Sequence, residues 1–197
     1  TGALWTVVNE RSYQLDSTNP AQLGRMIQSV SAGFGGISGI IHLQGLSSSS
    51  GSALLAFERQ LDRCVVAASL HKACEVERIK TRCWLVTSRA STYWLGESNR
   101  RQWEDIPSDR MDASLWGFGR TLMNEASAVE FRLLDIEDPA SVDTATYAFV
   151  RELTHPDAEH EVILTSLGDR FVPRLRAESR ESLFPELLGV SDRKSVV

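Results

Sequence analysis

Residues 115–125 read Leu115-Trp116-Gly117-Phe118-Gly119-Arg120-Thr121-Leu122-Met123-Asn124-Glu125, and residues 131–135 read Phe131-Arg132-Leu133-Leu134-Asp135. The first segment predicts a helix with two glycines near its start, and the second predicts a short buried strand. A helix that runs into a buried strand is half of the βα repeat from which parallel sheets are built. Neither segment carries the residues that such a repeat needs for chemistry.

Working outward, apolar runs rich in β-branched residues alternate with longer amphipathic stretches. We expect strands at residues 3–8, 39–43, 83–87, 130–135, 160–165 and 171–175, and an extended piece at 13–15. We expect helices from Pro20 to the glycines at 33–36, over about 53–79, around Trp116, and from Asp138-Pro139 to about 153. The alternation predicts an α/β, Rossmann-like fold of βαβ units around a mostly parallel sheet with helices on both faces.

The chain is predicted to close with an edge hairpin. Leu167-Gly168-Asp169-Arg170 is typical of a turn between two strands. Pro173 places the last strand at the edge of the sheet, because proline cannot donate to a central ladder.

Two further predictions concern packing. The strand at 39–43 is short and apolar on both faces, which favours a central position in the sheet. The buried face of the long helix at 53–79 is expected to be formed by Leu54, Leu55, Leu61, Val65, Ala68 and Leu70. 

Composition excludes several classes of protein. The 197 residues, 42% hydrophobic and 24% charged, predict one globular domain. A net charge of −5 with scattered arginines argues against a nucleic-acid partner. Apolar runs are too short for a membrane span, and no signal peptide opens the chain. Cys64, Cys74 and Cys83 form no CxxC pair, so we expect core cysteines in a reducing cytoplasm.

Glycine and lysine positions argue against a nucleotide or reductase site. Gly33-Phe34-Gly35-Gly36 follows a helix rather than a strand, so a helix C-cap explains it better than dinucleotide binding. Gly117 and Gly119 lack a third glycine, and close helix packing or helix entry is the favoured role. Short-chain reductases pair a tyrosine with a lysine four residues later, and no lysine here has that partner. Tyr147 is followed by Arg151, so we interpret Tyr147 as a packing residue.

The remaining candidates are histidines and carboxylates. His42 lies in an apolar strand and is interpreted as a hydrogen-bonded core histidine, with a catalytic role as the alternative. His155 and His160 are expected to be exposed. Asp135, Glu137 and Asp138 cluster at a strand end, where functional carboxylates often occur, although Asp138 is favoured as a helix cap. No GxSxG pentapeptide or metal-ligand spacing occurs. We therefore predict no catalytic, cofactor-binding or metal-binding residue.

Four motifs in this order resemble the ketoreductase region of modular type I polyketide synthases. They are Tyr13-Gln14-Leu15-Asp16 with Asn19-Pro20, Gly39 to Leu46, Arg82 to Ala90, and Leu115 to Arg120 continued by Asn124-Glu125 and Leu134-Asp135. Asp169 to Leu175 resembles the segment that precedes the catalytic half. The family motifs assign structural roles to Trp84, Trp116, Gly117, Gly119, Arg120, Asp135, Pro173 and Arg174. Gln44 departs from the pattern, since the family often has tryptophan there.

The resemblance is specifically to the amino-terminal structural subdomain. It implies a truncated Rossmann-like fold that binds no cofactor and packs against a catalytic subdomain of the same parent chain. That second subdomain would bind NADPH and reduce β-ketoacyl chains held on the phosphopantetheine of an acyl carrier. The implied partners are therefore the catalytic subdomain, the carrier and neighbouring synthase domains. By this resemblance the parent protein is an enzyme and this chain alone is not.

The domain organisation follows from the same resemblance. Residues 1–176 are expected to form the structural subdomain, and 177–190 a linker or tail towards the missing catalytic subdomain. Residues 192–197 match a translated sequencing adapter, and 191–197 are expected to be non-native. One alternative is a divergent free-standing Rossmann oxidoreductase or transferase that uses the strand ends near His42, Thr87 and Asp135. A third reading, compatible with the first, is a module that docks an acyl carrier or a neighbouring domain.

Overall fold

A computed structural model gives the fold, and it describes residues 6–9, 11–46, 53–91, 113–137 and 143–174. The elements in chain order are β1 (Thr6–Asn9), β2 (Ser12–Gln14), α1 (Pro20–Phe34), β3 (Gly39–Gly45), α2 (Ala53–Val76), β4 (Thr81–Ser88), α3 (Ala113–Glu125), β5 (Val129–Ile136), α4 (Asp143–Thr154), β6 (Glu161–Leu164) and β7 (Arg170–Phe171). The predicted loop residues 92–108 and the predicted helix start at Asp138-Pro139 lie outside the described residues.

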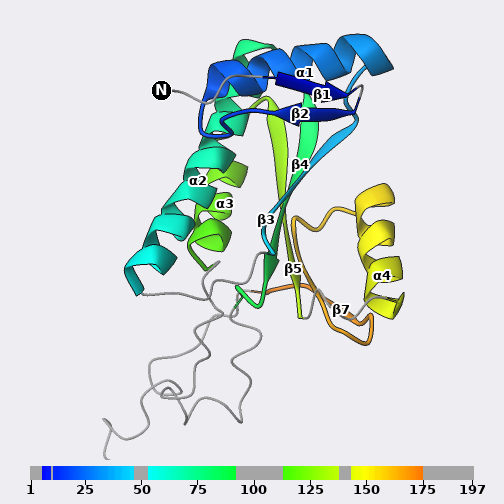
Figure 1. Cartoon of the computed structure of the whole chain (residues 1–197). Coiled ribbons are helices and arrows are strands. Elements are labelled where there is room, and N and C mark those ends of the chain that lie inside the picture. Colours follow the sequence, from blue (N-terminus) through cyan, green and yellow to red (C-terminus); the bar gives the residue numbers. More distant parts are fainter. Residues whose placement is uncertain (1–5, 10, 47–52, 92–112, 138–142, 175–197) are drawn as a thin grey trace, which may run out of the picture.

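A five-stranded sheet in the order β3-β4-β5-β6-β7 organises the molecule. β3 to β6 run parallel, and β7 pairs antiparallel with β6. Helices lie on both faces: α2 and α3 stand on one side of the sheet and α4 on the other (Figure 1). The predicted α/β fold with a mostly parallel sheet and a closing edge hairpin is therefore confirmed.

Alternation along the two central strands divides the core into two layers. Leu85 and Leu133 point to the layer shared with α1, α2 and α3. Trp84 and Leu134 point to the layer shared with α4. β4 and β5 stay in register over their whole length, and every residue of Cys83 to Thr87 is buried. Burial of one such aliphatic side chain contributes about 1.5–3 kcal/mol, so this pair of strands is the main stabilising unit.

Local sequence signals determine where α1 begins and ends. Asn19 caps the helix, because its side-chain oxygen accepts hydrogen bonds from the backbone nitrogens of Ala21 and Gln22. Pro20 follows in the first turn, where its missing N–H costs nothing. Gly35 ends the helix with a φ of 77°, a left-handed conformation that glycine adopts without strain. The prediction that this glycine-rich segment is a helix end is confirmed.

The N-terminal strands form a sheet of their own. β1 and β2 pair antiparallel and do not join the five-stranded sheet. A hydrogen bond of 3.1 Å between the Tyr13 hydroxyl and Ser29 Oγ connects this hairpin to α1. The sequence predicted strand character at 3–8 and 13–15, of which residues 6–8 and 13–14 fall in β1 and β2, but it did not predict their pairing.

The predicted central position of β3 is wrong. In the described part of the chain β3 has one neighbour, β4, and so forms the edge of the sheet. Ile41 and Leu43 are 44% and 50% exposed. A strand that is apolar on both faces is typical of a covered position. In the described residues β1 and β2 pair with each other and leave this edge of the sheet without a neighbouring strand.

Candidate functional site

The carboxyl ends of β4 and β5 are closed by one buried carboxylate. Asp135 Oδ1 accepts hydrogen bonds from Thr87 Oγ1 at 2.7 Å and from the Ala90 nitrogen at 2.9 Å, and Oδ2 accepts from the Ser91 nitrogen at 2.8 Å. Asp135 and Thr87 are both fully buried. The turn after β4 is thereby folded back over the end of the sheet, where Rossmann-like proteins usually bind a ligand. Asp135 holds this turn in place.

The neighbouring carboxylate has a similar role. Glu137 Oε2 accepts from the backbone nitrogen of Ser166 at 2.8 Å and from its hydroxyl at 2.9 Å. These bonds tie the end of β5 to the turn that follows β6. The third member of the predicted cluster, Asp138, lies outside the described residues.

His42 is a core residue without the hydrogen bonds predicted for it. It is 6% exposed, and among the residues that the structure describes neither ring nitrogen has a partner in hydrogen-bonding geometry. Burial lowers the pKa of His42 to about 4, with a smaller effect of Arg63 in the same direction, and polar contributions from its own backbone and Gln44 oppose this only in part. The imidazole is therefore neutral at pH 7. The predicted core position of His42 is confirmed, whereas its predicted hydrogen bond is not found in the described part of the chain.

The two glycines of α3 have different surroundings. A Cβ at Gly119 would lie 2.3 Å from Leu133 Cδ2 and 3.0 Å from Leu85 Cδ1, so the helix approaches the sheet at this point as only glycine permits. A Cβ at Gly117 would meet nothing within 4 Å. Of the two predicted roles, close helix packing or helix entry, close packing is confirmed for Gly119 and does not hold for Gly117, which faces open space. Trp116, which precedes Gly117, is buried in the core.

Other residues singled out by the family motifs join separate elements. Arg120 on α3 forms a bidentate ion pair with Glu161 at the start of β6, with distances of 2.8 and 2.7 Å. Trp84 is buried in the α4 layer, and a Cβ at Gly39 would lie 2.7 Å from its ring. Glycine at position 39 thus lets the indole lie over the start of β3.

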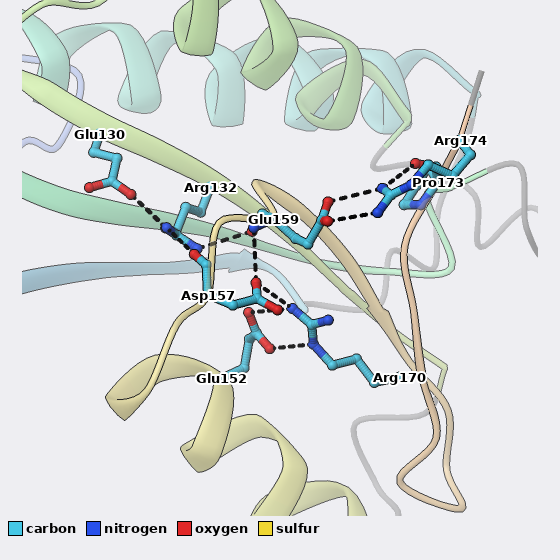
Figure 2. Close-up of polar contacts among 8 residues, drawn as sticks. All are labelled: Glu130, Arg132, Glu152, Asp157, Glu159, Arg170, Pro173 and Arg174. Atoms are coloured by element: carbon cyan, nitrogen blue, oxygen red, sulfur yellow. Dashed lines mark hydrogen bonds and ion pairs between the residues drawn. The ribbon is translucent and has the colours of Figure 1, made fainter.

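Three arginines hold the segment between α4 and β6 (Figure 2). Arg132, buried in β5, donates to the backbone oxygens of Asp157 at 2.8 Å and Glu159 at 3.0 Å. Arg170 donates to Asp157 Oδ1 at 2.9 Å. Arg174 binds both oxygens of Glu159 at 2.9 and 2.6 Å. The segment 157–159 is therefore held from the sheet on one side and from the end of the chain's last hairpin on the other.

Hydrogen bonds between the acidic and basic side chains of this region also shift their pKa values. Hydrogen bonding to Arg174 lowers the pKa of Glu159, and hydrogen bonding to Glu152 raises the pKa of Arg170. Arg174 follows half-buried Pro173, whose carbonyl oxygen accepts a further bond from it at 3.1 Å. Pro173 and Arg174 thus fix the position at which the chain leaves the last hairpin.

The predicted buried face of α2 is wrong at most of its positions. Leu54, Leu61 and Val65 were expected in the core but are 67%, 53% and 37% exposed. Leu55 is likewise 37% exposed, and Phe57 is 64% exposed. Of the predicted set, Leu70 is buried and Ala68 is intermediate. The side chains that cover the sheet lie on the opposite side of the helix and include Arg63, Ala67, Leu70 and Cys74.

The exposed side chains of α2 form a continuous stripe. Leu54, Phe57, Leu61 and Val65 are spaced by three, four and four residues, which places them on one side of a helix with 3.6 residues per turn. We call these four residues the α2 stripe. The stripe runs over about 16 Å at 1.5 Å per residue. A helix that is apolar on opposite sides is typical of one buried between two partners.

The remaining predictions fall into two groups. His155 and His160 are exposed, as expected, but Tyr147 is 73% exposed, so its interpretation as a packing residue is wrong. Cys74 and Cys83 are buried as free thiols, as predicted, while Cys64 is only half-buried. Burial raises the pKa of the Cys74 thiol to about 11 and also raises that of Cys83.

No helix among the described residues combines the length and apolar character needed to cross a membrane. No group of three or more histidine, cysteine or acidic side chains in the same ranges could hold a metal ion.

The chain is similar to known proteins both in sequence and in fold. Over 84 residues, or 42% of this chain, the sequence is 37% identical to the highly reducing polyketide synthase stpks1 of Strobilurus tenacellus. The matched part is 3% of that protein's length. No family model matches the chain.

The structural match concerns the fold. With a TM-score of 0.65 over 89% of this chain, the structure is similar to 14% of a solved chain described as the adenylation, ketoreductase and pseudo Asub multidomain structure of a keto acid-selecting NRPS module. The two sequences are 17% identical, so this match supports the fold alone. The sequence match thus supports the resemblance to part of a polyketide synthase, and the structural match shows a fold shared with part of a ketoreductase-containing NRPS chain.

Proposed function

We propose that this chain is the structural, non-catalytic subdomain of a ketoreductase region in a type I polyketide synthase. Its role is to bury the α2 stripe against a catalytic subdomain of the same parent protein. That subdomain would bind NADPH and reduce β-ketoacyl chains carried on phosphopantetheine. The matched relatives are much longer than this chain, which is consistent with further domains in the parent protein.

The observation that carries the proposal is the α2 stripe itself. Four large apolar side chains on one face of a helix, each at least 37% exposed, are costly to leave in water and mark an interaction surface. At about 25 cal/mol per Å² of apolar surface, covering such side chains is the main favourable term in association. A flat helical stripe suits a second helix better than it suits a small substrate.

The groups required by the rival enzymatic reading are not accessible. His42, Thr87 and Asp135 are 6%, 0% and 0% exposed, and the turn at Ala90 and Ser91 is hydrogen-bonded to the Asp135 carboxylate. Thr87 and the Asp135 carboxylate are hydrogen-bonded to each other, and His42 is neutral and enclosed. This arrangement supports a structural role for the three residues.

A co-purification experiment tests the proposed role. The chain is co-expressed with the catalytic subdomain encoded by the same parent gene, and only the catalytic partner carries a tag. We expect the wild-type chain to co-purify, and Leu61→Glu to be lost because it places a charge in the middle of the stripe. Leu167→Glu is the matched control, since Leu167 is 78% exposed and lies on the β6–β7 turn, far from α2 in the chain.

The outcomes separate the two readings. Equal recovery of Leu61→Glu and Leu167→Glu would contradict docking through the stripe. Tight NADPH binding by this chain alone, measured by fluorescence titration, would contradict the non-catalytic role and favour the enzymatic alternative.

A further inference from the structure

A cavity of about 290 Å³ lies between α4 and the turn that joins β6 to β7, on the side of the sheet opposite α2. Its polar lining consists of Tyr147, Arg151, Glu152, His155, Asp157 and Arg170. Of these residues, Asp157 and Arg170 also take part in the contacts that hold the segment 157–159.

Three of the four carboxylate oxygens that line the cavity already accept hydrogen bonds. Glu152 Oε2 and Oε1 accept from Arg170 at 2.8 and 3.4 Å. Asp157 Oδ1 accepts from Arg170 at 2.9 Å and from the backbone nitrogen of Glu159 at 2.9 Å (Figure 2). Arg170 therefore neutralises much of the acidic charge on this side of the cavity.

Several donors of the cavity are unused. Among the described residues, the guanidinium of Arg151 and the hydroxyl of Tyr147 have no hydrogen-bond partner, and both side chains are exposed. They lie four residues apart on α4, and so on the same side of the helix. Arg170 uses Nε and Nη2 for its carboxylate partners and keeps Nη1 for another acceptor.

We propose that this cavity binds a phosphate group, with Arg151 as its main ligand and with Tyr147 and the free nitrogen of Arg170 as further donors. Donors that approach from two elements, α4 and β7, suit a tetrahedral oxyanion better than a planar carboxylate, which one arginine fork can satisfy alone. The group could come from inorganic phosphate or from a phosphate ester of a larger molecule. The proposal does not depend on the α2 stripe or on the proposed function.

The test is a titration of the ¹⁵N-labelled full chain followed by NMR, with potassium chloride keeping the ionic strength constant. The probes are inorganic phosphate, glycerol 3-phosphate and dimethyl phosphate. We expect saturable shifts of the Gly168 amide, which lines the cavity, and of the Arg151 Nε–H, with a Kd of about 1–10 mM. Saturation by the two esters would identify an ester as the source, and saturation by inorganic phosphate alone would identify the free anion.

Substitutions locate the site. Arg151→Gln is expected to weaken binding about ten-fold, as is typical when a charge-assisted hydrogen-bond donor is lost. Tyr147→Phe should weaken it less, and neither exposed position should affect folding. Arg25→Gln, on the exposed face of α1, is the matched control and should bind as the wild type does. Shifts that fail to saturate with every probe, or a Kd unchanged by Arg151→Gln, would overturn the proposal.

Discussion

The two long faces of α2 carry similar side chains in opposite surroundings. Leu70 on the inner face is 5% exposed and packs against the sheet, whereas Leu61 on the outer face is 53% exposed. The composition of the helix is thus explained only in part by the fold of this chain. The inner face accounts for folding, and the outer face accounts for what we propose the chain does once folded.

The largest expected effect is the difference between these two leucines. Leu70→Ala should lower the free energy of unfolding by about 2–5 kcal/mol, because it leaves a cavity in a packed core. Leu61→Ala should change it by less than about 0.5 kcal/mol, because the side chain is already largely hydrated. Urea unfolding followed by circular dichroism measures both. Equal losses would mean that the stripe is covered within this chain.

Buried His42 is expected to make the stability of the chain depend on pH. Because burial lowers the folded pKa of His42 to about 4, below about 6.5 in the unfolded chain, only the unfolded state takes up the proton between these values. The stabilising preference for neutral His42 is fully present above pH 6.5 and is lost as the pH falls towards 4, in total about 3 kcal/mol.

Two variants isolate that contribution. His42→Leu should flatten the fall in stability between pH 6.5 and 4, measured by urea unfolding at several pH values. His155→Gln, which replaces an exposed histidine, should leave the wild-type profile in place. An unchanged profile in His42→Leu would show that His42 does not titrate abnormally.

The glycines of α3 give a pair of effects with opposite sign. Gly119→Ala should destabilise the chain by about 1–3 kcal/mol, because its Cβ would overlap Leu133. Gly117→Ala should stabilise it by up to about 1 kcal/mol, because alanine has the higher helix propensity and the position is open. Thermal unfolding of the two variants checks both signs. A stabilised Gly119→Ala would mean that α3 does not pack closely on β5.

These contrasts also show which features the sequence could predict. The α1 cap at Asn19, its end at Gly35 and the turn before Arg170 follow from short local signals, and the structure has all three. The buried face of α2 could not be predicted, because a helix that is apolar on two sides does not indicate which side meets its own sheet. The prediction for β3 was wrong for a similar reason. Its sequence is apolar on both faces, as in a covered strand, although β3 lies at the edge of the sheet.

The sequence pattern could not predict the long-range polar contacts either. The arginine contacts around 157–159 join residues from β5, β7 and the last hairpin, and no spacing along the chain relates Arg132 to Asp157 or Glu159. Only Arg174 and Pro173 were singled out, and by family resemblance rather than by pattern. Asp135 was predicted as a candidate carboxylate, but its structural role depends on the turn after β4, which its sequence position does not specify.

The smallest expected effect contrasts two arginines that bind the same segment. Arg174→Gln removes an ion pair between two side chains that are 66% and 33% exposed, so solvent screening makes its contribution to stability small. We expect the midpoint of urea unfolding to stay within experimental error of the wild type. Arg132→Gln removes a buried guanidinium that binds two backbone oxygens, and should lower that midpoint clearly. If Arg174→Gln weakens co-purification with the catalytic subdomain while leaving the midpoint unchanged, its role is to direct the chain that leaves the last hairpin. If it lowers the midpoint as much as Arg132→Gln does, the contact belongs to the folding core.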